Sequence, residues 1–213
     1  MHKVLLYTAS LFVFLQIAAC KSGGISSDEQ ARVKALESLP RKEYQHGGVN
    51  FSLAEIEGMR QVDRDSVPWA NYMPDTEENG QLGYYFFPGF ARDLSAPQVR
   101  VEYMSKALPG CSTVDSLFTW LKGLYVGTER NGKVVGEDPI GTLNGDEIKL
   151  LQIEIPKFVV DDSTQYSEKY MAWAYADQGE RFVGFSYSAV TADDYKQGFP
   201  LFQDLVRSYK ANK

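Results

Sequence analysis

A β-hairpin between residues 169 and 188 constrains the fold of this chain more than any other part of its sequence. Residues 169–176 and 181–188 are rich in aromatic side chains, and Asp177-Gln178-Gly179-Glu180 between them is a turn sequence. Large residues alternate with alanines in the first run: Met171, Trp173 and Tyr175 with Ala172, Ala174 and Ala176. Because successive side chains of a strand point to opposite faces, the alanines share one face, which a helix can approach closely. The hairpin therefore predicts an antiparallel sheet with helices packed on it.

Helices are predicted where a capping residue precedes apolar residues at helical spacing. The predicted N-caps are Ser27, Ser112 and Thr191. Pro40 ends the first helix, and Asp115 completes a capping-box pattern at the second. Gly198 and Pro200 interrupt the last helix, so we expect its regular part to begin near Pro200.

Alternating apolar residues and turn sequences predict further strands. They span residues 49–53, 59–62, 82–87, 98–104, 125–129, 133–136, 140–143 and 148–155. Glu57-Gly58, Asn131-Gly132 and Asn144-Gly145 predict hairpins that join the strands on either side of them. The order of elements is helix, strands, helix, strands, helix. This order predicts an α+β fold with a central antiparallel sheet flanked by helices.

From Leu82 onward the pattern resembles PsbP-like and DcrB-like domains. The resemblance rests on Gly145 with an alternating strand, on Phe185-Ser186-Tyr187-Ser188, and on a closing helix that carries Phe199, Phe202 and Val206-Arg207-Ser208. It implies an α/β/α sandwich of the PsbP-like type. Members of that fold are mostly non-enzymatic and act through protein contacts, so the resemblance implies no specific function.

The first 26 residues predict an exported, lipid-anchored protein. Met1-His2-Lys3 is basic, residues 4–18 are mostly apolar, and Ile17-Ala18-Ala19-Cys20 ends the run. This arrangement resembles the lipobox of bacterial lipoproteins, which implies a signal peptide over 1–19 and lipid on Cys20. The alternative is an ordinary signal peptide cut at an A-x-A-like site. Residues 20–26 then form the lipidated tether, and 27–213 form a single domain.

The predicted location is the bacterial cell envelope, with the lipid of Cys20 as the membrane contact. Lys21 does not match the Asp that usually retains lipoproteins at the inner membrane, which favours the outer membrane facing the periplasm. The chain has 28 acidic against 22 basic residues and no Lys/Arg block. This charge pattern argues against a nucleic-acid partner.

Residues able to support catalysis are scarce. His46 is the one histidine left after signal removal, so a zinc site built from several His or Cys ligands is excluded. Gly184-Phe185-Ser186-Tyr187-Ser188 lacks the second glycine of a nucleophile elbow. We therefore predict no catalytic residues, no metal, no cofactor and no enzymatic activity.

Cys111 is the remaining thiol if Cys20 carries lipid, and it has two interpretations. It precedes a predicted helix N-terminus, where a thiol pKa is lowered, and a pair with His46 would make it reactive. The alternative is a small buried apolar residue, which is common for an unpaired cysteine and is the interpretation we favour.

The leading functional hypothesis is a non-catalytic accessory module that binds an envelope protein. The candidate contact residues are Trp69, Tyr72 and Met73, in an irregular loop predicted over 63–81. The alternative is a small-ligand-binding protein or minor hydrolase that uses an aromatic cleft. A deep pocket with several polar groups would favour the alternative, and a filled core with a flat exposed patch would count against it.

Overall fold

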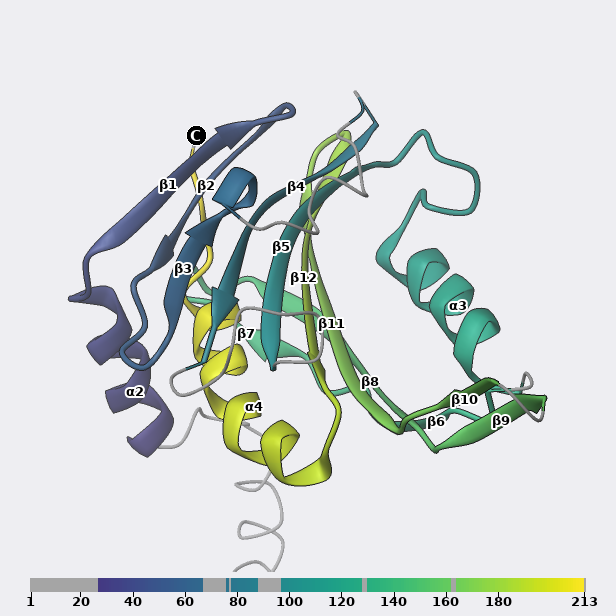
Figure 1. The fold of residues 1–213 in the computed structure, drawn as a ribbon. Coiled ribbons are helices and arrows are strands. Elements are labelled where there is room, and N and C mark those ends of the chain that lie inside the picture. The colour runs from purple at the N-terminus through teal and green to yellow at the C-terminus, as the bar shows by residue number, and fades with distance from the viewer. Residues whose placement is uncertain are drawn as a thin grey trace, which may run out of the picture.

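An antiparallel sheet built around the predicted hairpin forms the centre of the fold (Figure 1). The structure is a computed structural model that describes residues 27–66, 76, 78–87, 97–127, 130–161 and 164–212. Its helices are α2 (Ser27–Glu37), η2 (Arg64–Ser66), α3 (Val114–Tyr125) and α4 (Ala192–Arg207). Its strands are β1 (Arg41–His46), β2 (Val49–Ala54), β3 (Arg60–Asp63), β4 (Asn79–Phe86), β5 (Gln98–Ser105), β6 (Lys133–Gly136), β7 (Ile140–Gly141), β8 (Glu147–Ile155), β9 (Phe158–Asp161), β10 (Thr164–Tyr166), β11 (Lys169–Gln178), β12 (Arg181–Ala189) and β13 (Lys210–Ala211).

The central sheet has the strand order β3-β4-β5-β12-β11-β8-β6, and β7 pairs with the start of β8. All of its pairs are antiparallel among the described strands. β11 and β12 form the predicted hairpin, in which Trp173 lies opposite Ser186 and Gly179 takes a φ of 69° in the turn. The predicted α+β class with a central antiparallel sheet is confirmed.

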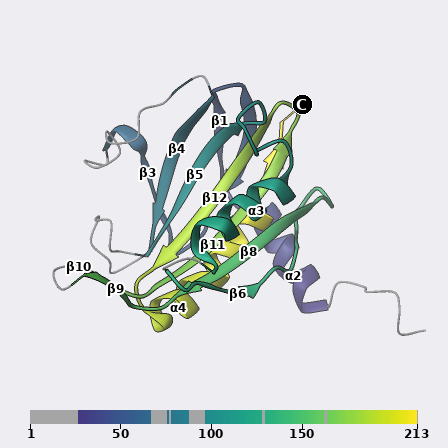
Figure 2. The same ribbon diagram turned by 90° about the vertical axis from the view of Figure 1, so that its right-hand side faces the viewer.

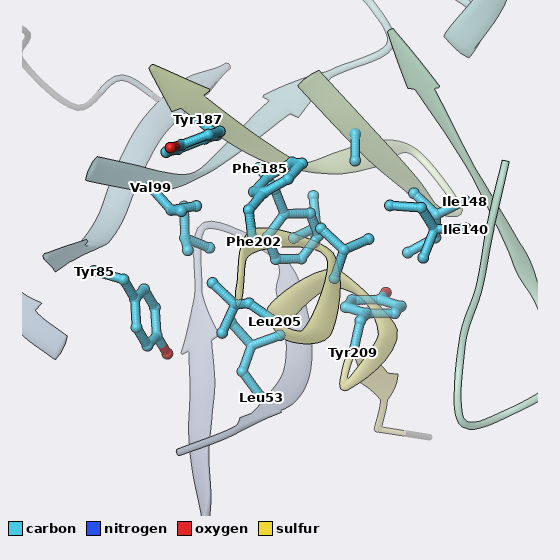
Figure 3. Close-up of a cluster of buried hydrophobic side chains, with 14 of the residues drawn as sticks. Leu53, Tyr85, Val99, Ile140, Ile148, Phe185, Tyr187, Phe202, Leu205 and Tyr209 are labelled. Carbon is cyan, nitrogen blue, oxygen red and sulfur yellow. The ribbon is translucent and has the colours of Figure 1, made fainter. Parts of the chain in front are cut away.

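The alanine face of β11 carries the larger hydrophobic core. Ala172, Ala174 and Ala176 are buried there with Phe185 and Tyr187 of β12. Helix α4 lies over these strands and adds Phe202, Leu205 and Val206, which are fully buried (Figure 3). A smaller sheet, β1-β2-β13, packs on the same side as α4 (Figure 1). The sequence predicts that a helix can approach the alanine face closely, and α4 packs against this face of the sheet.

The opposite face of the sheet packs against α3 (Figure 2). Trp173 and Tyr175 of β11 and Leu151 and Ile153 of β8 form its core with the helix. Leu117, Phe118 and Leu121 are the buried side chains of α3. Helices therefore lie on both faces of the sheet, as the predicted α/β/α sandwich requires.

Helix α4 does not begin near Pro200. It runs without a break from Ala192 to Arg207 with Pro200 inside it, so this prediction is wrong. Thr191 is its N-cap, as predicted, and its hydroxyl accepts from the Asp194 amide at 3.1 Å. A proline costs a helix one internal hydrogen bond. Burial of one side of α4 along the sheet outweighs that loss.

The strand pairing predicted across Glu57-Gly58 is also wrong. β2 pairs with β1 through the turn at Gly47-Gly48, and β3 pairs with β4. β1 has the sequence RKEYQH, and Tyr44 is its one buried side chain. A strand that buries so little apolar surface has no alternating pattern by which it can be recognised.

The hairpin predicted across Asn131-Gly132 does not form. Helix α3 continues to Tyr125, and β6 pairs with β8 instead. The Gly132 amide donates to the Tyr125 carbonyl at 2.8 Å, and Asn131 takes a φ of 49°. The Asn-Gly turn therefore brings the chain back against the end of a helix. The α3 N-cap is Thr113 with Ser116, one residue later than predicted.

Candidate functional site

The residues predicted for lipidation and partner binding lie outside the described part of the chain. Cys20 belongs to residues 1–26, and Trp69, Tyr72 and Met73 belong to residues 67–75. Their roles stay predictions. The loop predicted over 63–81 is shorter than expected, because η2 follows Asp63 and β4 begins at Asn79.

Cys111 lies in the core between α3 and the sheet. It is buried, and its amide donates to the Leu108 carbonyl at 3.0 Å. Burial raises the pKa of the Cys111 thiol. His46 contacts Tyr103, which belongs to the core on the opposite face of the sheet. The structure therefore does not bring His46 and Cys111 together, and the reactivity of Cys111 stays a prediction.

A cleft between α3 and the sheet brings aromatic and charged side chains together. We call it the α3 cleft, and its volume is about 250 Å³. It is lined by Asn79, Gly80 and Gln81 of β4, Arg100, Glu102, Tyr103 and Met104 of β5, Trp120, Leu121, Leu124 and Tyr125 of α3, and Met171, Trp173 and Tyr175 of β11. Figure 2 shows α3 in front of the strands that form the floor.

The sheet side of the α3 cleft is polar. Arg100 Nε and Glu102 Oε2 form an ion pair at 2.9 Å, with side chains 30% and 13% exposed. The Glu102 carboxylate raises the pKa of Arg100 above its ordinary value, against the opposing effect of burial. Beside this pair, the Tyr84 hydroxyl donates to Gln81 Oε1. The wall thus presents a guanidinium, a carboxylate and amide groups.

Gly184 of β12 leaves room for two side chains that line the α3 cleft. It lies opposite Glu102 of β5 on one side and Tyr175 of β11 on the other. A Cβ at Gly184 would lie 2.7 Å from Tyr175 Cε1 and 2.9 Å from Glu102 Cγ, which is closer than packed carbons approach. The absent side chain lets the Tyr175 hydroxyl reach Glu102 Oε1, at 3.5 Å. Burial raises the pKa of Tyr175 well above its ordinary value, so the hydroxyl stays protonated.

The helix side of the α3 cleft is aromatic and apolar. Trp120 and Leu124, one turn apart on α3, are 51% and 38% exposed. Deeper in, Tyr125 stacks on Trp173 with ring centroids 5.5 Å apart. Most large apolar side chains of the described residues are buried, so the exposed Trp120 and Leu124 make this cleft the candidate for a binding surface.

A second groove on the other flank of α3 is occupied by the protein's own ion pairs. Asp115 pairs with Lys149 at 2.6 Å, and Lys122 pairs with Glu137 across the same groove. Exposed pairs of this kind contribute little to stability, but they pair four of the five charged side chains that line the groove. We therefore place the candidate site in the α3 cleft.

Within the described residues, no three His, Cys, Asp or Glu side chains gather closely enough to hold a metal ion. The same part of the chain contains no helix that is long and apolar enough to cross a membrane.

Comparisons with known proteins find likeness in structure but none in sequence. No protein-family model and no curated protein matches the chain. Among solved structures, it is similar to the cyanobacterial PsbP protein CyanoP from Synechocystis sp. PCC 6803, with 14% identity, 91% of this chain and 97% of that chain covered, and a TM-score of 0.48. It is similar to LpqN of Mycobacterium tuberculosis, described as involved in cell envelope biogenesis, with 9% identity, coverage of 90% and 100%, and a TM-score of 0.48.

A third similar structure is the Ran-binding protein Mog1p of Saccharomyces cerevisiae, with 10% identity, coverage of 82% and 96%, and a TM-score of 0.46. At these identities the likeness concerns the fold. CyanoP is a PsbP protein, and the sequence pattern from Leu82 onward resembles PsbP-like domains.

Most of the α3 cleft is not predictable from the sequence. In the sequence, Arg100 and Glu102 occupy the polar positions of an alternating strand, which predicts that they face solvent. Gly184 lies between Val183 and Phe185 in an apolar strand and carries no side chain that would indicate a site. A signal was present in Gly184 alone, since glycine inside a strand often marks a close approach of other groups.

Proposed function

We propose that this chain is a lipid-anchored, non-catalytic binding module of the bacterial cell envelope, and that its binding site is the α3 cleft. The observation that carries the proposal is the half-exposed Trp120 at the mouth of a cleft whose opposite wall holds the Arg100–Glu102 pair. Binding sites combine apolar surface with a few convergent polar groups in this way. Ile17-Ala18-Ala19-Cys20 supports the anchor, which places the domain at a membrane surface of the envelope, the outer membrane in our proposal.

The groups in the α3 cleft support binding rather than catalysis. The Glu102 carboxylate is already paired with Arg100, and the Tyr175 hydroxyl is held protonated by burial. A general base or nucleophile needs a pKa near the working pH, or a neighbouring group that takes its proton. A Tyr175 pKa well above its ordinary value does not meet the first condition, and Glu102 is engaged by Arg100.

A protein partner is the first candidate occupant. Tryptophan is enriched among the residues that dominate protein interfaces, and Trp120 with Leu124 forms a short apolar ridge that could anchor a partner. A small envelope ligand is the second candidate. The polar wall of the cleft favours it, because a small polar ligand can add hydrogen bonds to the Arg100–Glu102 pair.

A photo-reactive amino acid placed at residue 124 in living cells tests the site. We expect it to form a specific adduct that disappears when Trp120→Ala is added. The same label at residue 135 is the matched control, since Val135 is 54% exposed but does not line the cleft. Equal labelling from both positions, or none from residue 124, would contradict the proposed site.

Metabolic labelling with a palmitate analogue tests the anchor separately. The wild-type chain should take up the label and fractionate with membranes, and Cys20→Ser should do neither. Label retained by the Cys20→Ser variant would refute lipidation at this residue.

A further inference from the structure

The chemistry of the α3 cleft identifies a class of ligand, because its walls differ in kind. We infer that the cleft binds the ring of a neutral saccharide, with the apolar face of the ring on Trp120 and its hydroxyl groups toward Arg100 and Glu102. The inference rests on the proposed binding function and deepens it by naming the ligand class.

The net charge of the cleft argues for a neutral ligand. Arg100 and Glu102 are the charged residues among its described lining, and their charges compensate at 2.9 Å. A charged group that entered would lose its hydration without gaining a net opposite charge. Neither an anion nor a cation is therefore selected by this site.

The polar wall argues for hydroxyl groups. It mixes donors and acceptors at close spacing: a guanidinium that only donates, a carboxylate that only accepts, and the amides of Asn79 and Gln81 that do both. A hydroxyl group can donate and accept at once, so neighbouring hydroxyls on a ring match such a wall. A hydrocarbon ligand would take the Arg100–Glu102 ion pair out of water without adding hydrogen bonds to it, which is unfavourable for a charged pair.

The aromatic wall argues for a ring with an apolar face. Trp120 is half exposed at the mouth, while Trp173 and Tyr175 are buried in the floor. An indole offers a wide, rigid apolar surface at little cost in side-chain entropy. A sugar ring has carbon-bound hydrogens on its faces and hydroxyls on its edge, so it satisfies both walls together.

The size of the cleft agrees with a small occupant. Its volume of about 250 Å³ lies just below the range of about 300–1,000 Å³ that is typical of pockets for drug-sized ligands. The cleft therefore suits one sugar ring, with the neighbouring rings of an oligosaccharide outside it.

The binding experiments titrate the full mature protein in detergent rather than the lipid-free domain, residues 27–213. The probes are maltotetraose, cellotetraose and chitotetraose, followed by tryptophan fluorescence and calorimetry. Isolated insoluble cell-wall glycan in a sedimentation assay distinguishes a polymeric source from a soluble one. We expect at least one of these probes to bind, with an affinity that changes little between about 0.05 and 0.5 M salt because the site has no net charge.

Two substitutions at Trp120 separate ring stacking from general apolar contact. Trp120→Leu should weaken binding by about tenfold, and Trp120→Phe should weaken it by less, because only the second keeps a π-face. Val135→Ala, at an exposed site off the cleft, should bind like the wild type. Since Trp120 is half exposed, both variants should keep the thermal unfolding midpoint of the wild type.

Absence of binding to every probe would overturn the inference, and so would full affinity in Trp120→Leu. The photo-crosslinking experiment from residue 124 decides the proposed binding function independently of these saccharide results. A specific protein adduct from residue 124 together with no saccharide binding would mean that the cleft holds a protein partner. No adduct and no saccharide binding would refute both.

Discussion

Replacing Gly198 by alanine should destabilise this protein, although the same change inside a helix normally stabilises. Gly198 is buried in α4, where a Cβ would overlap the Tyr187 hydroxyl and lie 3.0 Å from Phe87 Cε1 and Cζ. Tyr187 is fully buried and stacks against Tyr195 and Phe202, with centroids 5.1 and 5.5 Å away. Its ring therefore has no room to move aside.

The opposing effects can be compared in magnitude. Alanine gains about 1 kcal/mol over glycine in helix propensity. Overpacking costs about 1–3 kcal/mol. The Tyr187 hydroxyl also donates to the Asp194 carbonyl at 2.9 Å, and loss of that hydrogen bond adds about 1 kcal/mol. The net expectation is a free energy of unfolding lower by about 1–3 kcal/mol.

Urea denaturation of Gly198→Ala beside Gly123→Ala measures the effect. Gly123 lies in α3, and a Cβ there would meet no atom within 4 Å, so only helix propensity changes. Gly123→Ala should therefore stabilise by up to about 1 kcal/mol. A Gly198→Ala variant as stable as the wild type, with the expected gain at Gly123, would refute the claim that the helix needs a glycine to approach the sheet.

Other variants test the capping, the ion pairing and the buried hydroxyls. Thr113→Ala removes the α3 capping box and should lower the urea midpoint by an amount equivalent to about 1 kcal/mol. Asp204→Asn removes the negative charge that Arg32 contacts through Nε at 2.6 Å and Nη2 at 2.8 Å, and should cost about 1 kcal/mol and increase amide exchange in α2. Burial raises the pKa of Tyr85 from 10.0 to about 12, so the contribution of this residue to the free energy of unfolding should be constant below about pH 10 and fall between about pH 10 and 12, where the unfolded chain loses the proton first. Tyr85→Phe should make that alkaline fall shallower, and an unchanged slope would contradict the assigned cause.

The sequence predicts the strands that bury an alternating face and the helices that have a capping residue. Val99, Val101 and Tyr103 share one buried face of β5, as their spacing indicates. Thr191 caps α4, as expected from its position before Asp193 and Asp194. In these segments local pattern and tertiary packing favour the same structure, so a single sequence is sufficient.

Other segments depend on contacts that no local pattern contains. Asn131-Gly132 has the sequence of a hairpin turn, yet the tertiary partner of β6 is β8 and the turn closes on the end of α3. Pro200 and Gly198 look like interruptions, but one stays inside α4 and the other provides the close approach to Tyr187. The α3 cleft likewise joins residues from strands and a helix far apart in sequence, and only the sheet order brings them together.

The position of the α3 cleft follows from the widths of a helix and of strands. β5 and β8 are separated by β12 and β11, so they lie about 14 Å apart in the sheet. Helix α3 packs over β8, and a helix with its side chains is only about 10 Å wide. It therefore cannot cover β5 as well, and Gly184 on the intervening strand β12 leaves the space above it to the side chains of Tyr175 and Glu102. The opposite face has α4 and the β1-β2-β13 sheet packed against it. A binding site in this fold is thus favoured on the α3 face, where Arg100, Glu102 and Trp120 meet.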